Sequence, residues 1–108
     1  MPQEAPVPVV VVATITPLPG QADAVREAIL AAVPAVHAEP GCELYALHEA
    51  DGEFVLVERW ESADALRVHG RAEALTTLGG QLAGKVAGAP DVKRLTPVPA
   101  GDADKGAV

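Results

Sequence analysis

The feature that most constrains the fold is a run of mainly β-branched residues from Val7 to Thr16. Such residues favour extended strands, and Pro17 with the Pro19-Gly20 pair ends the run. Both faces of the strand are apolar, because positions 9, 11, 13 and 15 carry Val, Val, Ala and Ile, and positions 10, 12 and 14 carry Val, Val and Thr. A strand of this kind is buried on both sides. One layer of helices covers one face only, so the sequence predicts a second covering surface.

The segment from Gln21 to about Ala38 predicts an amphipathic helix, since its apolar residues recur at helical spacing. Pro34 lies within it, and we expect a kink or a break at that position.

Two strand-like runs follow, Glu43–Glu49 and Phe54–Trp60, and Asp51-Gly52 lies in the connection between them. Asp-Gly is a preferred two-residue hairpin turn, because it accepts positive φ at both positions. With this pair at the turn centre, the register is fixed. On one face the predicted partners are Glu49 with Phe54, Leu47 with Leu56, Tyr45 with Glu58, and Glu43 with Trp60; on the other they are His48 with Val55, Ala46 with Val57, and Leu44 with Arg59.

The remaining elements predict a split helix and a last strand. Ser62 is a good N-cap for a short helix to His69, Gly70 breaks it, a second stretch covers 71–83, and a strand covers 92–96. The order β-α-β-β-α-β predicts an α+β, ferredoxin-like split βαβ fold with an antiparallel sheet and helices on one face. We expect one domain over residues 7–97, a flexible N-terminus over 1–6 and a flexible tail over 98–108.

Composition excludes several classes of function. The 108-residue chain has a formal net charge of −7, which argues against a nucleic-acid partner. Its single cysteine, Cys42, excludes an internal disulfide and a cysteine-based zinc site. The run from Val7 to Ile15 is too short to span a bilayer, and no basic leader precedes it. We therefore expect a cytoplasmic protein with no membrane partner.

The predicted register places Tyr45, Glu58 and Trp60 on one face of the hairpin, with Tyr45 and Glu58 close enough for a hydrogen bond. A buried carboxylate at this position on the sheet lowers the stability of the fold unless it is paired or faces a cavity that contains water. The face is either a pocket that contains an acid, a phenol and an indole, or a solvated surface. His69 is either a helix cap or a general base in that pocket.

The other histidines give a weak case for a metal, since His37 and His48 have no ligand spacing with each other or with His69. His37 is expected on the polar side of its helix, and His48 on the opposite sheet face. The chain also has no glycine-rich phosphate loop and no nucleophile elbow.

Three stretches carry a family resemblance: Val10–Gly20 (VVVATITPLPG), Ala38–Tyr45 (AEPGCELY) and Phe54–His69 (FVLVERWESADALRVH). Together with the element order, they make the chain similar to the antibiotic biosynthesis monooxygenase family, which includes small quinol and anthrone monooxygenases. The resemblance covers about residues 9–97. The sequence departs from the family at Ala74 and Leu75, where members often have His and Phe.

The resemblance implies a homodimer formed through the sheets, with assembly into a higher oligomer as an open alternative, and a cavity between sheet and helices. It implies oxidation of an electron-rich aromatic with O₂ as co-substrate and no cofactor. The carried-over positions are Tyr45, Glu58, Trp60 and His69. We expect His69, Glu58 and Tyr45 to be catalytic, and Trp60, Phe54 and Leu56 to contact substrate. The haem-degrading branch is disfavoured, because the chain has no histidine after His69.

The function expected from these features is a cofactor-independent monooxygenase acting on a quinol, an anthrone or a polyketide-like aromatic. Two alternatives stay open at this stage. One is a non-catalytic dimeric ligand-binding domain, since fold does not fix function. The other is a non-oxidative isomerase or lyase acting on a small carbonyl compound.

Overall fold

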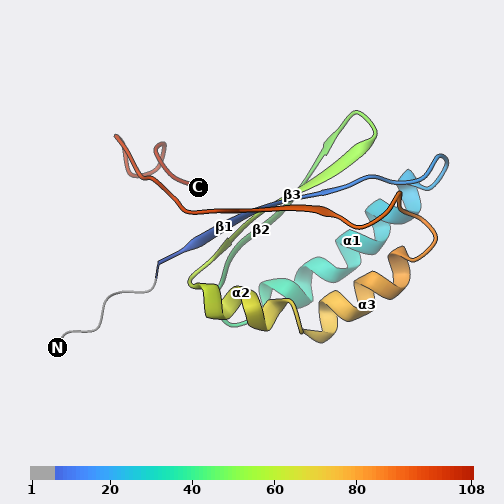
Figure 1. The fold of residues 1–108 in the computed structure, drawn as a ribbon, viewed down its shortest axis with the longest axis horizontal. Helices are drawn as coiled ribbons and strands as arrows, with labels where there is room; N and C mark the ends of the chain where they lie inside the picture. The colour runs from blue at the N-terminus through green and yellow to red at the C-terminus, as the bar shows by residue number, and fades with distance from the viewer. Residues whose placement is uncertain (1–6) are drawn as a thin grey trace.

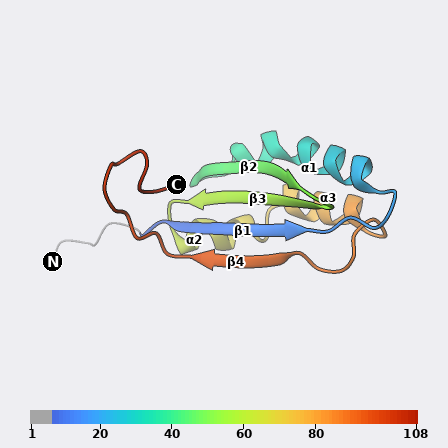
Figure 2. The same cartoon turned by 90° about the horizontal axis from the view of Figure 1, so that it is seen from above.

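The computed structural model describes residues 7–108 and contains four strands and three helices. In chain order these are β1 (Val9–Ile15), α1 (Ala22–His37), β2 (Cys42–Ala50), β3 (Glu53–Trp60), α2 (Ala63–His69), α3 (Glu73–Leu82) and β4 (Asp91–Leu95). The strands form one antiparallel sheet in the order β2-β3-β1-β4. The helices lie on one face of that sheet (Figures 1 and 2). The predicted α+β ferredoxin-like fold is therefore confirmed.

Helix α1 continues through Pro34 to His37, so of the two outcomes expected at this residue, a kink or a break, the break does not occur. A proline cannot donate to the carbonyl four residues earlier, which belongs to Leu30. Leu30 and Pro34 are both exposed residues, so the missing hydrogen bond falls on the solvent side of the helix. A free carbonyl is less unfavourable there than in the core, which is consistent with an uninterrupted helix.

The predicted hairpin register is confirmed for the residue pairs from Glu49 with Phe54 to Tyr45 with Glu58. The last predicted pair, Glu43 with Trp60, is wrong. Cys42, not Glu43, lies opposite Trp60, because the register shifts between Cys42 and Leu44. The irregularity turns the exposed Glu43 side chain to solvent, where it accepts a hydrogen bond of 2.8 Å from Arg59 Nε. The less polar Cys42 packs against the core instead.

The two faces of β1 have different surroundings. Val11, Ala13 and Ile15 are buried on the helix side. On the other side Val10 is buried, while Val12 and Thr14 are only half-buried. No helix within residues 7–108 covers this second face (Figure 1). The predicted two-sided burial of β1 is thus complete on the helix side only.

The segments predicted to be flexible lie at the two ends of the chain. Residues 1–6 fall outside the described residues. In the tail, Asp102 Oδ1 accepts hydrogen bonds from the backbone N–H groups of Asp104 and Lys105. Arg59 donates to the backbone oxygen of Val108. The flexibility of the tail stays a prediction. Over residues 7–108, every helix is too short or too polar to cross a membrane.

The turn from α1 into β2 packs directly against α2. Gly41 has a φ of +83°, and a Cβ atom built there would lie 2.5 Å from the Cβ of Ala65 in α2. The Gly41 carbonyl also accepts a 2.9 Å hydrogen bond from the backbone N–H of Glu61, just before α2. Only glycine allows both the positive φ and the close approach. This contact ties the residues around Gly41 to the helix that carries His69.

We predict that Gly41→Ala destabilises the protein more than Gly52→Ala. Gly52 also has a positive φ, of +72°, but no atom lies within 4 Å of a Cβ built there. Gly52→Ala should lower the free energy of unfolding by about 1–2 kcal/mol, the cost of the left-handed conformation. Gly41→Ala should lose roughly 1–3 kcal/mol more through overpacking against Ala65. Urea unfolding of both variants measures the difference, and equal losses would contradict the proposed close contact.

Candidate functional site

A cavity of about 300 Å³ lies between the sheet and helices α2 and α3. Most of its lining is aliphatic and comes from β1, β3, α2 and α3; four side chains, Tyr45, Glu58, His69 and Arg94, bring polar groups to it. An apolar cavity with a few polar groups is the usual form of a small-molecule site, and this volume lies at the lower end of the usual range. The cavity therefore suits a compact, mainly apolar ligand.

Small residues leave the space for this cavity. Ala13 lines it from β1, and Gly70 and Gly79 line it from the helical side. Gly79 lies inside α3, where a glycine lowers helix stability by about 1 kcal/mol relative to alanine. A Cβ built at Gly79 would meet no atom within 4 Å, so a side chain at this position would enter open space.

His69 is fixed at one end of the cavity by a carboxylate from a distant part of the chain. Its Nδ1 lies 2.9 Å from Glu39 Oε1 and 3.2 Å from Oε2. A carboxylate only accepts hydrogen bonds, so Nδ1 carries the proton that is donated to Glu39. In the neutral ring, Nε2 then has a free lone pair. Glu39 follows α1 and precedes Gly41, so the packed turn described above holds it beside His69.

Trp60 supports this arrangement from the core. Its ring stacks on the ring of His69, with the centroids 4.4 Å apart and an interplanar angle of 29°. Its indole N–H donates a 3.0 Å hydrogen bond to Glu58 Oε1. Trp60 is completely buried and does not line the cavity. It therefore orients two polar side chains of the site.

Glu58 and Tyr45 are both buried beside His69. Burial raises the pKa of the Glu58 carboxyl, although the Trp60 hydrogen bond and the His69 charge oppose the shift. Burial, together with the negative charges of Glu58 and Glu39, also raises the pKa of the Tyr45 phenol. Glu58 Oε1 lies 4.0 Å from His69 Nε2, which is too long for a hydrogen bond. The predicted hydrogen bond between Tyr45 and Glu58 is not formed between these two described residues, since Glu58 accepts from Trp60 instead.

The structure brings together Tyr45, Glu58, Trp60 and His69, which the sequence grouped, and Leu56 lines the same cavity. Phe54 lies elsewhere: it is buried further along β3, and the Arg26 guanidinium carbon lies 5.3 Å from its ring centre. Phe54 is not among the residues that line the cavity.

Two polar residues of the site, Arg94 and Glu39, are not among those expected from the sequence. For Glu39 a signal is present in the AEPG stretch, where an acidic residue directly precedes a Pro-Gly turn. What the sequence could not indicate was that this turn packs on α2, close to His69.

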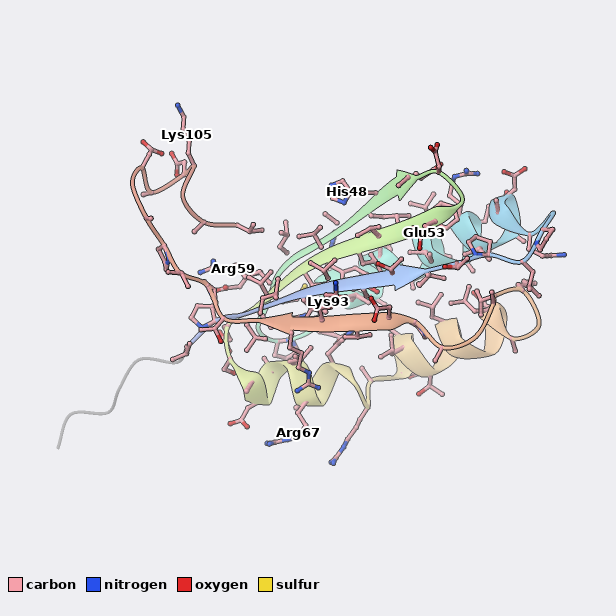
Figure 3. All side chains as sticks on the ribbon, turned by 45° about the horizontal axis from the view of Figure 1, so that its top comes forward. His48, Glu53, Arg59, Arg67, Lys93 and Lys105 are labelled. Carbon is pink, nitrogen blue, oxygen red and sulfur yellow. The ribbon has the colours of Figure 1, made fainter. Side chains whose placement is uncertain are left out.

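The other two histidines lie away from the cavity. Nε2 of the exposed His37 is 3.0 Å from the backbone oxygen of Tyr45. His48 projects from the face of the sheet opposite the helices (Figure 3). Within residues 7–108, no group of three or more His, Cys, Asp or Glu side chains has an arrangement that could hold a metal ion.

Comparison with known proteins finds a family for this chain. The family model described as antibiotic biosynthesis monooxygenase matches residues 8–78. A solved Caulobacter crescentus structure named for the same family is 30% identical, with a TM-score of 0.80 and coverage of 86% of this chain and 92% of that one.

Two further solved structures are similar over nearly their whole length. A Mycobacterium tuberculosis protein is 31% identical with a TM-score of 0.80, and the match covers 88% of this chain and 99% of that one. A Pseudomonas aeruginosa protein is 26% identical with a TM-score of 0.81, covering 89% and 99%. No curated protein matches the sequence.

We predict that Glu58→Gln stabilises the protein in a pH-dependent way. The folded protein holds the Glu58 proton to a higher pH than the unfolded chain does, so the carboxyl destabilises the fold as the pH rises through its raised pKa. Glutamine cannot ionise and still offers an acceptor to Trp60. The variant should be more stable than the wild type at about pH 8 and lose that advantage below the ordinary glutamate pKa of 4.5.

Urea unfolding at several pH values measures this difference. Glu27→Gln, at an exposed position of α1, is the matched control and should change stability little at any pH. A Glu58→Gln variant that is less stable than the wild type at high pH would contradict the prediction.

Proposed function

The chain belongs to the antibiotic biosynthesis monooxygenase family, and from this premise we propose that it oxidises a small electron-rich aromatic compound with O₂ and without a cofactor. The family and its structural relatives support a generic monooxygenase-like function. The observation that carries the finer proposal is the Glu39–His69 pair at one end of a mainly apolar cavity.

The first chemical step that we propose is removal of a proton from the substrate by His69. Glu39 holds the Nδ1 proton, so Nε2 is the basic nitrogen. His69 is only 5% exposed, and the stacked Trp60 and the Glu39 contact fix its ring plane. A base held in one orientation in a desolvated site loses little energy to reorganisation when the substrate ionises. The result is a carbanion-like or phenolate substrate rich enough in electrons to react with O₂.

The oxidation balances without an external reductant. A ring CH₂ group of an anthrone-type substrate becomes a carbonyl, one oxygen atom enters the new C=O bond, and the other leaves as water with the two hydrogens. The four electrons that reduce O₂ come from the carbon that is oxidised. Such chemistry needs a shaped cavity, a base and a proton donor.

Glu58 is the proton donor in this proposal. Burial raises its pKa, so it holds a proton closer to neutral pH than an exposed glutamate does. Its Oε1 lies 4.0 Å from His69 Nε2, so base and donor lie at the same end of the cavity. Tyr45, whose ring centre is 5.8 Å from that of His69, is proposed to orient the substrate oxygen, and Leu56 to contact the ring.

We predict that His69→Gln lowers the turnover rate by about 100-fold or more, the usual contribution of a general base. The measurement is O₂ uptake with a panel of hydroquinones and anthrones, with product analysis in the presence and absence of O₂. His48→Gln is the matched control, because that histidine is exposed on the opposite sheet face and should leave turnover unchanged.

Three outcomes would overturn the proposal. The first is that a folded protein shows no O₂ uptake with any member of the panel. A non-catalytic ligand-binding domain is then the remaining interpretation. The second is a product that forms equally well without O₂, which indicates an isomerase or lyase. The third is full activity of His69→Gln, which removes the assigned base.

We also propose that two copies associate through the helix-free face of the sheet. Its central row contains Ala46, Val57 and Val12 in register, and all three are half-buried in the single chain. A row of apolar side chains at the centre of a sheet face that no helix covers within residues 7–108 is typical of an interaction site. A second copy would complete the two-sided burial of β1.

We predict that Val57→Glu prevents this association, because it would place a charge at the centre of a buried interface. Light scattering after size-exclusion chromatography should give a dimer for the wild type and a monomer for the variant. Val68→Glu introduces the same charge at a valine of α2 that is 56% exposed, and should stay dimeric. A monomeric wild type, or a dimeric Val57→Glu variant, would contradict the proposed interface.

A further inference from the structure

One cross-strand row of side chains runs across the whole sheet beneath the cavity. The register places Tyr45 opposite Glu58, Glu58 opposite Val11, and Val11 opposite Arg94. Residues that lie opposite each other share one face of a sheet. The row therefore runs from a phenol and a carboxyl on β2 and β3, across the methyl groups of Val11 on β1, to a guanidinium on β4.

Arg94 is the cationic side chain at the far end of this row. It lines the cavity, whereas its neighbour Lys93 does not, as strand alternation requires. Among the described residues Arg94 has no salt bridge and no hydrogen-bonded side-chain partner, unlike Arg26, Arg59 and Arg67. A guanidinium in this position offers a planar fork that matches a carboxylate with two parallel hydrogen bonds.

The two ends of the row differ chemically, because Arg94 carries a positive charge at one end, while the other end presents the Tyr45 phenol and the Glu58 carboxyl that holds a proton in the proposed mechanism. An anionic group near Glu58 would meet a carboxyl, and the same group near Arg94 would meet a guanidinium. Neighbouring strands lie about 4.8 Å apart, so the backbones of Glu58 and Arg94 are separated by roughly 10 Å. An aromatic ring system can cover Val11 between them while its two ends reach the two polar groups.

We propose that the substrate is an aromatic carboxylate, whose carboxylate binds Arg94 while the carbon to be oxidised lies beside His69 and Glu58. This inference rests on the proposed function, because it names the class of substrate for the same cavity. Arg94 acts in binding and orientation, and it takes no part in proton transfer. Lys93 carries the same charge on the same strand and the opposite face, so the structure offers a matched comparison.

The test measures binding with compounds that do not react with O₂. Isothermal titration calorimetry compares 2-naphthoate with 2-naphthalenemethanol, which replaces the carboxylate with a neutral alcohol. Wild type should bind the naphthoate more tightly. Arg94→Gln should weaken naphthoate binding by about 10-fold or more, as expected for a hydrogen bond to a charged group. It should change the affinity for the alcohol by less than about twofold, and Lys93→Gln should alter neither affinity.

Salt gives a second readout. Raising the ionic strength should weaken naphthoate binding to the wild type and to Lys93→Gln, and have little effect on Arg94→Gln. The inference is overturned if wild type binds neither compound, if it binds the alcohol as tightly as the naphthoate, or if Arg94→Gln weakens both equally.

These results are separable from the test of the monooxygenase itself. Charge-selective binding of naphthoate by a protein that shows no O₂ uptake with any hydroquinone, anthrone or aromatic carboxylate would overturn the proposed function and leave the binding site in place. Oxidation of neutral hydroquinones and anthrones by a protein that shows no selectivity for the naphthoate would overturn the role of Arg94 alone.

Discussion

Strand β1 carries apolar side chains on both faces of the sheet, and most of the architecture depends on how these side chains are buried. It pairs with β3 on one side and β4 on the other, so it lies inside the sheet, and its side chains alternate between the helix side and the helix-free face. Toward the helices it carries Val11, Ala13 and Ile15, and the small Ala13 leaves room for a cavity. Toward the other face it carries valines that the single chain covers only in part. The cavity and the proposed surface for a second copy thus lie on opposite sides of the same seven residues.

Much of the fold could be predicted from the sequence because its signals are local. Asp51-Gly52 fixes a hairpin turn, and strand alternation then determines that Tyr45 lies opposite Glu58. Ser62 caps α2 as expected, since its hydroxyl accepts a 3.1 Å hydrogen bond from the Ala65 N–H. The wrong pair at the end of the hairpin arises because two neighbouring residues, Cys42 and Glu43, compete for the position opposite Trp60. Cys42 takes the place opposite Trp60 because Glu43 is more stable in solvent beside Arg59, and no local pattern reveals which residue is displaced.

The candidate site was harder to predict, because its parts come from separate elements. Glu39 lies 30 positions before His69, and their contact depends on a glycine turn that packs against a helix. The sequence grouped Trp60 with the cavity, whereas the structure places it behind the cavity, where it orients Glu58 and His69. Periodicity assigns a residue to a face of the sheet, but only tertiary packing determines whether that residue contacts a ligand or supports one that does. For the same reason Phe54, on the predicted face, lies outside the cavity.

The exposed edge strand has a consequence for how a ligand reaches the site. All five residues of β4 are exposed, and the strand pairs with β1 alone. Segments with little buried apolar surface separate locally at a lower free energy than the rest of a fold. Since β4 contributes Val92 and Arg94 to the cavity lining, one wall of the cavity is an exposed edge strand. Local separation of this strand from β1 would expose the cavity without disturbing the apolar contacts between α1, β1 and β3 that form the core.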